Sequence, residues 1–264
     1  MSEEHVVKPD WKAIYAIAFG VVVLTASQTL PASLLTPLAA DLGVSEGLAG
    51  QTMTATAAVA FVTSLVIAFV ARNLNRRTLL LALASIQIVS NLLVAVAPNL
   101  ALLLLGRMLL GIALGGTWSF CAAVAMRLAP APLVPRALSI IFGAGTIASV
   151  AAIPIGSSLD SIVGWRAVFL GVVTLGLVAL AWQFVALPSM PPQGRTRLST
   201  MFNLFWRPQI RLGMLAVLLF FAGHFAYFTY LRPFLEEVTH VGVRELSLIQ
   251  LGFGLASVVG TVFA

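Results

Sequence analysis

The stretch AFVARNLNRRT at residues 68–78 places three arginines between two long apolar runs, and the rest of the chain is organised around it. These runs, 49–71 and 79–97, are each close to the roughly 20 residues that a helix needs to cross the hydrocarbon core of a membrane. The arginines are therefore expected in a tight loop between two transmembrane helices. Short arginine-rich loops stay in the cytoplasm during insertion, so this loop predicts the orientation of every other span. The three residues are Arg72, Arg76 and Arg77.

The composition is that of a polytopic membrane protein. Of the 264 residues, 60% are hydrophobic and 9% are charged, and the mean hydropathy is +1.03, which excludes an ordinary soluble globule. The formal charge of +6 is spread among apolar runs and does not form one basic face, so no nucleic-acid partner is predicted. Cys121 is the single cysteine, which excludes an intramolecular disulfide and a CxxC metal or redox site.

Eight apolar segments follow one another along the chain, which predicts an all-α polytopic fold. The longest polar interruption, 188–211, predicts a cytoplasmic linker between a six-helix bundle at 1–187 and the start of a second bundle at 212–264. This order is the plan of a two-halved transporter. The expected spans are 13–35, 49–71, 79–97, 100–124, 137–159, 166–187, 212–231 and 246–264.

Basic residues in the loops agree on one orientation. Eleven of them fall on the side of the 68–78 loop and three on the other side, so the first side and the N-terminus are expected in the cytoplasm. The eleven are Lys8, Lys12, Arg72, Arg76, Arg77, Arg127, Arg136, Arg195, Arg197, Arg207 and Arg211. The three are Arg166, Arg232 and Arg244.

A short internal repeat supports two halves. LTPL at 35–38 aligns with LRPF at 231–234, which places Gln28 opposite His224, each nine residues before its proline. Both lie deep inside a span, where an unpaired polar group is costly, so both are expected to face the bundle interior or a water-filled cavity. Two roles stay open: they line a solute cavity, or they hold neighbouring helices together by hydrogen bonds.

Other polar residues lie at helical spacing from Gln28 and His224. Three threonines recur on the Gln28 side of the first span, and Tyr227 shares a side with His224 in the seventh. The threonines are Thr25, Thr29 and Thr36. We therefore expect a substrate or proton pathway that includes Thr25, Gln28, His224 and Tyr227.

Arg107, in LLLLGRMLLG at 102–111, is expected about two turns inside the fourth span. An arginine at such a depth costs at least about 2.5 kcal/mol on insertion scales. Two interpretations stay open: a fixed positive charge beside the translocation path, or a residue whose side chain extends to the outer surface. Gly111 and Gly115 form a GxxxG pattern that lets helices approach closely. Pro154 predicts a loosened or kinked fifth span, a candidate hinge.

Several segments together match a family pattern. They are PASLLTPLAADLGVSEGLAGQ (31–51), GRMLLGIALGGTW (106–118), MRLAP (126–130), RALSIIFGA (136–144), PIGSSLDSIVGWRAVF (154–169) and FAYFTYLRPF (225–234). From about residue 11 to the end, the chain resembles the major facilitator superfamily, drug:proton antiporter-1 type. The resemblance implies a six-helix bundle, followed by the first two helices of a second bundle, in the bacterial inner membrane. It implies no cofactor, no metal site and no catalytic residue.

The loop after the second span departs from this family's pattern. Relatives usually read GxxxDRxGRR there, and only Arg76 and Arg77 are kept. Since Arg72 stands where the acidic residue is usual, the chain lacks the side chain to which the family's conformational latch is attributed. The other replaced positions are Ala68, Asn73 and Asn75.

Other motif positions bear on proton coupling. Arg107, Gly111 and Gly115 match the fourth-span motif, in which the arginine is associated with proton movement, and Pro154 matches the antiporter motif of the fifth span. Relatives commonly carry a membrane-embedded glutamate where this chain has Gln28, whose amide cannot titrate.

The acid–base candidates are therefore few. None of the nine acidic residues lies mid-span, and an arginine stays protonated. Apart from Arg107, His224 is the one mid-span residue left that could change charge near neutral pH. If protons are the coupling ion, His224 or helices beyond this sequence must carry them.

Two hypotheses follow from the resemblance. The first is proton-coupled efflux of a small solute, with purine nucleosides as the leading expectation and sugars or drugs as alternatives; Trp118 could stack on a purine ring or simply pack. The second is a truncated carrier without transport of its own, because relatives have twelve spans. No HExxH, GxSxG, P-loop or paired-carboxylate pattern predicts an enzyme.

Overall fold

A computed structural model describes residues 9–192, 207–220, 223, 252 and 256 of the chain. The chain divides into two units, Met1–Pro192 with Val258–Ala264, and Gln193–Ser257. In the second unit the described helix is Pro208–Phe220. It overlaps the start of the predicted seventh span; the rest of that span and the predicted eighth span lie outside the described residues, apart from three isolated positions.

Six helices of the first unit are long and apolar enough to cross a membrane, which confirms the predicted six-helix bundle. The largest boundary differences are the ends of α5 and α6, at Leu128 where 124 was expected and at Val163 where 159 was expected. The six are α1 (Trp11–Ser33), α3 (Glu46–Val70), α4 (Arg76–Ala95), α5 (Leu100–Leu128), α6 (Val134–Val163) and α7 (Trp165–Ala186). Three short elements connect them: α2 (Leu35–Asp41), η1 (Ala71–Asn73) and η2 (Ala131–Leu133).

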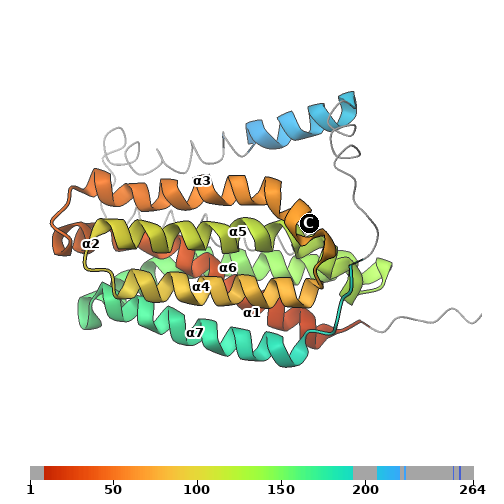
Figure 1. The fold of residues 1–264 in the computed structure, drawn as a ribbon, viewed down its shortest axis with the longest axis horizontal. Coiled ribbons are helices and arrows are strands. Elements are labelled where there is room, and N and C mark those ends of the chain that lie inside the picture. Colours follow the sequence, from red (N-terminus) through yellow and green to blue (C-terminus); the bar gives the residue numbers. More distant parts are fainter. Residues whose placement is uncertain (1–8, 193–206, 221–222, 224–251, 253–255, 257–264) are drawn as a thin grey trace, which may run out of the picture. The chain divides into compact units, whose positions relative to one another are not determined.

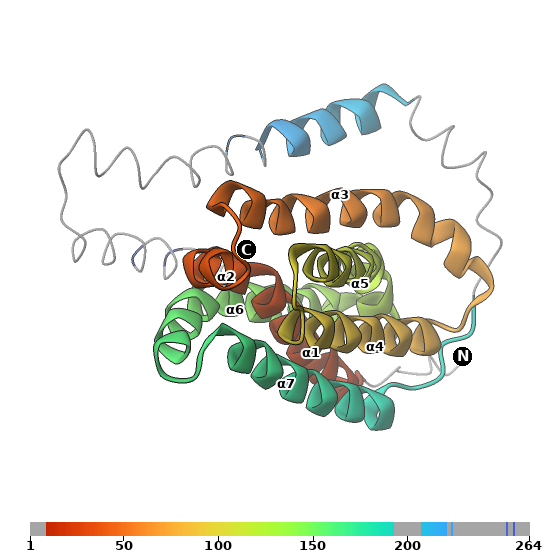
Figure 2. The ribbon, with the colours of Figure 1, turned by 60° about the vertical axis from the view of Figure 1, so that its left-hand side comes forward.

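The helices lie side by side in Figures 1 and 2. α3 packs on α5, α5 on α4 and α4 on α7, whereas α1 packs mainly on α6 and α7. The loop between α3 and α4 lies at one end of the bundle, together with the end of α5 and the end of α7. We call this end, which carries Arg72, Arg76, Arg77 and Arg127, the arginine end.

Polar residues begin four of the long helices, because the first turn of a helix leaves backbone N–H groups without partners. Each of these side chains accepts a hydrogen bond from a first-turn N–H at 3.0–3.3 Å. They are Asp10, Ser45, Asn75 and Asn99. Between α6 and α7 a single residue, Gly164, turns the chain with φ +78°, a value that side chains disfavour.

The first span breaks earlier than predicted. α1 ends at Ser33, and Leu34 adopts φ −107° and ψ 13° before α2 starts. Pro31 in the last turn of α1 has no N–H to donate, which weakens the hydrogen-bond ladder at this point. Thr36 therefore lies on α2 and donates to Glu46 at 2.7 Å. The prediction that Thr36 continues the polar face of the first span is wrong.

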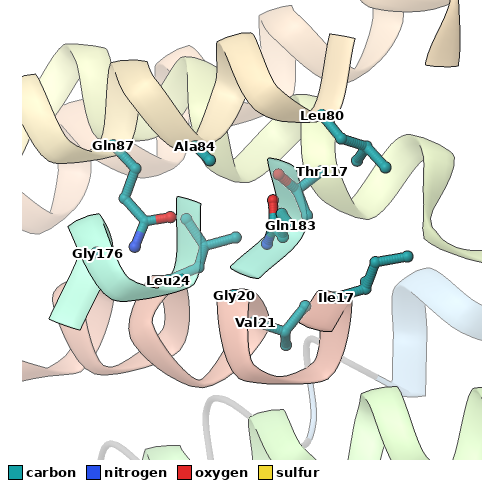
Figure 3. A pocket seen from close by; sticks show the side chains of 11 residues that line it. Ile17, Gly20, Val21, Leu24, Leu80, Ala84, Gln87, Thr117, Gly176 and Gln183 are labelled. Atoms are coloured by element: carbon teal, nitrogen blue, oxygen red, sulfur yellow. The ribbon is translucent and has the colours of Figure 1, made fainter. Parts of the chain in front are cut away.

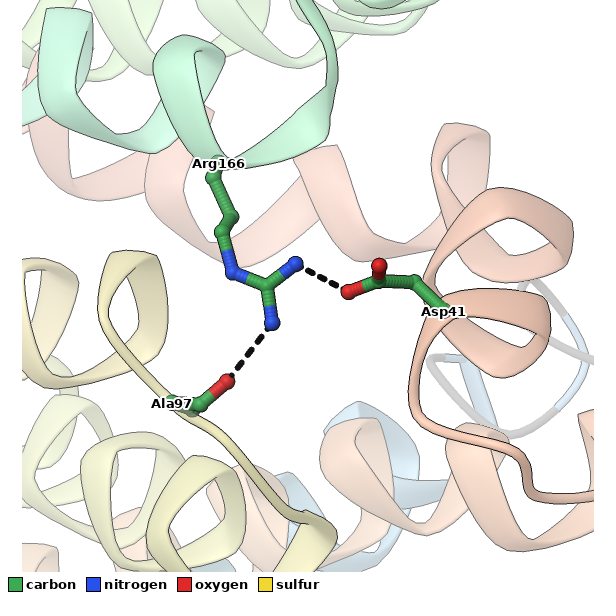
Figure 4. Close-up of polar contacts among 3 residues, drawn as sticks. All are labelled: Asp41, Ala97 and Arg166. Carbon is green, nitrogen blue, oxygen red and sulfur yellow. Dashed lines mark hydrogen bonds and ion pairs between the residues drawn. The ribbon is translucent and has the colours of Figure 1, made fainter.

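At the end opposite to the arginine end, Arg166 ties three segments together (Figure 4). Its guanidinium forms an ion pair with Asp41 at the end of α2 and donates to the carbonyl oxygen of Ala97, after α4, at 2.9 Å. Because Arg166 is the second residue of α7, these contacts hold the start of α7 against the α2 and α4 ends.

α3 and α5 make the closest helix contact of the first unit. A methyl group at Gly111 would lie 2.6 Å from the carbonyl oxygen of Thr56, and one at Gly115 would lie 2.3 Å from that of Ala60. Both distances are far inside van der Waals contact, so only glycine allows the two backbones to approach this closely. The GxxxG pattern thus positions α5, which carries Arg107, against α3.

We predict that Gly115→Ala lowers the free energy of unfolding by about 1–3 kcal/mol, because α3 and α5 must separate to admit the methyl group. Reversible unfolding in mixed micelles measures the change. Gly171→Ala is the matched control, since Gly171 is also helical but has nothing within 4 Å of an added methyl group. It should be neutral or stabilising by about 0.5–1 kcal/mol. Equal stability of the two variants would contradict the close contact.

Candidate functional site

Arg107 lies at the centre of the polar interior of the first unit. It is the eighth residue of α5 and its side chain is 1% exposed. Its guanidinium donates to three backbone carbonyl oxygens: Ser27 at 2.7 Å, Gln28 at 3.3 Å and Thr52 at 3.5 Å. The charge is thus surrounded by carbonyl dipoles of α1 and α3. Of the two interpretations of Arg107, the one in which its side chain extends to the surface is wrong.

Pro31 explains why α1 offers a carbonyl to Arg107. In a regular helix the N–H of residue 31 would bind the carbonyl oxygen of Ser27, and a proline has no N–H. The oxygen of Ser27 is therefore left for Arg107, with which it makes the shortest of the three bonds. In lipid, a backbone carbonyl without a hydrogen-bond donor is costly. Pro31 leaves the Ser27 carbonyl without its donor in α1, and Arg107 supplies one from α5.

Further polar contacts surround Arg107 on α3, α4 and α1. Thr56 donates to the carbonyl oxygen of Arg107 at 3.2 Å, and Ser90 donates to that of Gly106 at 2.7 Å. Asn91 donates to the hydroxyl of Ser27 at 3.0 Å. These bonds connect four helices around one residue.

Thr25 and Gln28 lie one turn apart on α1, as predicted. Thr25 is 8% exposed, and its hydroxyl has no hydrogen-bond partner among the described residues. Gln28 is half-buried; its backbone binds Arg107, and no described residue binds its side-chain amide. Thr29, on the same side, instead donates back to the α1 backbone.

An aromatic pair lies next to Thr25, between α5 and α6. The rings of Trp118 and Phe142 stack at a centroid distance of 5.5 Å and an interplanar angle of 6°. A methyl group at Gly145 would lie 3.5 Å from the Thr25 hydroxyl and 3.6 Å from the Trp118 ring, which places these groups around one point. Both rings are more than a third exposed on the first unit.

A small cavity lies between α1, α4, α5 and α7 (Figure 3). Its volume is about 20 Å³, and its polar lining comes from Gln87, Thr117 and Gln183. Gln183 is 6% exposed and donates to the carbonyl oxygen of Ala16 at 3.3 Å. The cavity is too small for an organic solute, and neither Thr25 nor Gln28 is among the residues that line it.

The three arginines of residues 68–78 differ in their placement. Arg72 lies in η1, is exposed and stacks over Phe69 at 4.8 Å. Arg76 and Arg77 are the first two residues of α4. The prediction that they lie in the loop is therefore wrong. A positive charge is unfavourable at a helix N-terminus, and both side chains turn away to carbonyl oxygens, Arg76 to Ala71 and Arg77 to Phe184.

Asn75 links the segment after α7 to the start of α4 by hydrogen bonds. Its side-chain oxygen accepts from the N–H of Met190 at 2.9 Å, and its amide donates to Ser189 at 2.7 Å. The N–H of Arg76 donates to the carbonyl oxygen of Met190, and Arg127 donates to that of Pro191. The first residues of the predicted linker, up to 192, are therefore fixed on the first unit.

Of the remaining predicted positions, Pro154 lies within the described residues, whereas His224 and Tyr227 do not. Pro154 is exposed inside α6, which continues through it to Val163, and its carbonyl oxygen accepts from the hydroxyls of Ser157 and Ser158. His224 and Tyr227 lie outside the described residues. Within residues 9–192, every carboxylate is at a helix end or a loop, so none lies beside Arg107. No group of three metal-ligating side chains occurs among the described residues.

Sequence reasoning missed several residues of the polar interior. Gln87, Asn91 and Gln183 are polar side chains inside apolar spans, the same signal that identified Gln28. Ser27 carried no signal, because a serine in a membrane helix commonly binds its own backbone, as this one also does. Asn75 carried the signal of a helix N-cap, a polar residue directly before a periodic segment.

Comparisons with known proteins agree with this architecture. A family model described as Major Facilitator Superfamily matches residues 17–264. The purine ribonucleoside efflux pumps NepI of Salmonella enteritidis and Salmonella typhimurium are each 46% identical over 261 residues, which is 99% of this chain and 66% of the pump. The chain thus spans slightly less than two thirds of the length of these relatives.

Two solved structures share the fold. A bacterial homolog of the human lysosomal transporter Spinster, inward-facing and unoccupied, has a TM-score of 0.67 at 18% identity, covering 94% of this chain and 59% of that chain. The proton:xylose symporter XylE, bound to 6-bromo-6-deoxy-D-glucose, has a TM-score of 0.72 at 15% identity, covering 96% and 68%. At these identities the likeness concerns the fold alone.

We predict that Pro31 and Arg107 are energetically coupled. Pro31→Ala provides an N–H for the Ser27 carbonyl, so Arg107→Met should cost about 1 kcal/mol less in the Pro31→Ala background than in the wild-type background. A double-mutant cycle of unfolding free energies measures the coupling. Pro154→Ala is the control proline, in a different helix, and should add independently of Arg107→Met. Additive effects of Pro31→Ala and Arg107→Met would rule out the shared carbonyl.

Proposed function

This chain belongs to the Major Facilitator Superfamily, a family of membrane transporters, and from that membership we propose that the natural gene product exports purine ribonucleosides. The observation that carries the proposal is the 46% identity, along 99% of this chain, to pumps named for that activity. The six candidate spans are those of a multi-pass membrane protein, and we propose that it lies in the bacterial inner membrane and moves a small solute across it. Its solute class is the part that needs testing.

Four described residues support a purine solute. Trp118 and Phe142 offer exposed aromatic surface on which a planar base can stack. Thr25, which lies near Trp118, and Gln28, one turn further along α1, have side-chain polar groups that no described residue binds. A purine ribonucleoside has a flat ring with hydrogen-bonding edges, which fits stacking combined with a hydroxyl and an amide. Sugars, which lack an aromatic ring, and drugs are the competing solutes.

Proton coupling is a second part of the proposal. Gln28 cannot titrate, and no carboxylate of residues 9–192 lies inside the bundle. Arg107 has three carbonyl partners and stays protonated, so we assign it to holding α1 and α3 together and not to carrying a proton. His224, outside the described residues, is the proposed proton carrier, because its imidazole changes charge near neutral pH.

The test is solute counterflow in vesicles that contain the natural gene product, whose intact mass is measured first. Vesicles loaded with inosine should accumulate labelled inosine from outside. Gln28→Leu should lower this exchange about 10-fold, since it removes a hydrogen bond to the solute. Gln51→Leu is the matched control, because Gln51 is exposed near the start of α3 and should leave the exchange unchanged.

Each contrary outcome has a distinct meaning. Exchange of xylose or of a drug without exchange of inosine would contradict the purine solute. A product that exchanges none of these solutes would favour the alternative of a non-transporting carrier fragment. In the same vesicles, His224→Gln should abolish inosine movement driven by a pH gradient and leave counterflow intact. Unchanged gradient-driven movement would remove His224 as the proton carrier.

We also propose that the arginine end and the N-terminus face the cytoplasm. Among residues 9–192, six cationic side chains and one carboxylate lie at the arginine end, whereas one cation and three carboxylates lie at the opposite end. This asymmetry follows the rule that basic loops stay inside. The cations at the arginine end are Lys12, Arg72, Arg76, Arg77, Arg127 and Arg136, against Asp10. The opposite end carries Arg166 with Asp41, Glu46 and Asp160.

Two variants, each with one added cysteine, test this orientation. Asn73→Cys in η1 and Ala40→Cys in α2 each place an exposed thiol at one end, and the native Cys121 is buried and should stay silent. A membrane-impermeant thiol reagent should label Ala40→Cys in intact cells and Asn73→Cys after permeabilisation alone. Labelling of Asn73→Cys in intact cells would reverse the orientation.

A further inference from the structure

We propose that the cavity between α1, α4, α5 and α7 is a binding site for one structural water molecule, held by Gln87, Thr117 and Gln183. Neither Thr25 nor Gln28 lines this site, which does not depend on the identity of the solute. Its function is to join three helices through polar groups that do not reach one another directly. The proposal rests on the volume, the lining and the hydrogen-bonding state of those three side chains.

The lining holds donors and acceptors that remain to be satisfied. Gln87 is 6% exposed and lines the cavity, and no described residue binds its side-chain amide. Gln183 makes one bond, from its amide nitrogen to Ala16 at 3.3 Å, which leaves its side-chain oxygen to accept another. The hydroxyl of Thr117 also has no bond to a described residue. A buried amide without partners is strongly unfavourable inside a membrane helix bundle.

The shape of the site favours a single small polar ligand. Its volume of about 20 Å³ exceeds the roughly 10–15 Å³ needed for one water. Figure 3 shows the Gln87 and Gln183 side chains, from α4 and α7, among the residues that line the cavity. A water molecule makes two to four hydrogen bonds, which matches three side chains that offer both donors and acceptors.

The small residues of the lining keep this space open. A methyl group at Gly20 would lie 2.0 Å from the amide nitrogen of Gln183, so glycine is what admits this amide between α1 and α7. Gly176, Ala84 and Ala179 also line the cavity. Larger side chains at these positions would fill the site with hydrocarbon and leave Gln87 without a ligand.

The bridge has a structural consequence in the lipid. Between membrane helices there is little hydrophobic driving force, so hydrogen bonds and close packing decide how they associate. The water would connect α7 to α4 and α5. Through Asn91, which donates to the carbonyl oxygen of Gln87 and to Ser27, it would also adjoin the contacts of Arg107.

Two substitutions in the natural gene product distinguish a hydrated site from a dry one by the sign of the change in Tm. Gln87→Leu replaces the amide by an apolar group of similar size. If the cavity is dry, Tm should rise, because an unpaired amide has been removed. If water is bound, Tm should fall by about 3 °C or more, because the water and its other partners lose a bond.

Ala84→Val applies the same test without touching a polar group. Filling a dry cavity should raise Tm, whereas displacing a bonded water should lower it. Ala82→Val is the matched control: Ala82 is exposed on the same helix, so the same added methyl groups should leave Tm nearly unchanged. A rise in Tm for both Gln87→Leu and Ala84→Val would overturn the proposal.

A second measurement detects the water in the unaltered protein. X-ray radiolysis of a bound water produces hydroxyl radicals that oxidise adjacent side chains. Leu24 and Leu80, which line the cavity, should be oxidised in the wild type and protected at least about threefold in Ala84→Val, as expected when an ordered water is displaced. Leu103, fully buried elsewhere in the bundle, should stay unlabelled in both. Absence of labelling at Leu24 and Leu80 in the wild type would refute the site.

Discussion

The guanidinium of Arg107 donates to three backbone carbonyl oxygens on α1 and α3, and the interior of the first unit is arranged around this contact. Inside a membrane every backbone polar group needs a partner within the protein. Pro31 withholds one donor from α1, and Arg107 provides a replacement from α5. A residue that is expensive to bury is thereby matched to a carbonyl that the helix itself cannot satisfy. The bond between Arg107 and the Ser27 carbonyl oxygen thus meets the needs of both groups.

This contact requires α5 to lie very close to α3, and two glycines make that approach. Gly111 and Gly115 bring the α5 backbone against the carbonyl oxygens of Thr56 and Ala60. Thr56 in turn binds the backbone of Arg107. The hydrogen bonds between α3 and α5 therefore depend on the close packing at the two glycines. The glycines set the distance at which the hydrogen bonds can form.

The cations of the arginine end are stabilised differently from Arg107, because they lie near water. Arg72 stands where the family usually has an acidic residue, so a contact built on a carboxylate at that position is absent. Arg76 and Arg77 instead donate to carbonyl oxygens, and Asn75 binds the chain that leaves α7. Backbone carbonyls and one amide provide the contacts that hold this end together. The hydrogen bonds of Asn75, Arg76 and Arg77 thus replace a contact to an acidic side chain at position 72.

The membrane class, the six-helix bundle and most helix ends could be predicted from the sequence, because span length and hydropathy depend on the lipid and not on neighbouring helices. It also identified Arg107, Thr25 and Gln28, since polar groups inside apolar runs are conspicuous. Their hydrogen-bond partners could not be predicted and are visible in the folded bundle alone. That Arg107 is buried and that Gln87 and Gln183 line one cavity both depend on residues far apart in the chain. Hydropathy is a property of single segments, whereas a hydrogen bond needs two groups whose separation is set by the packing of several helices.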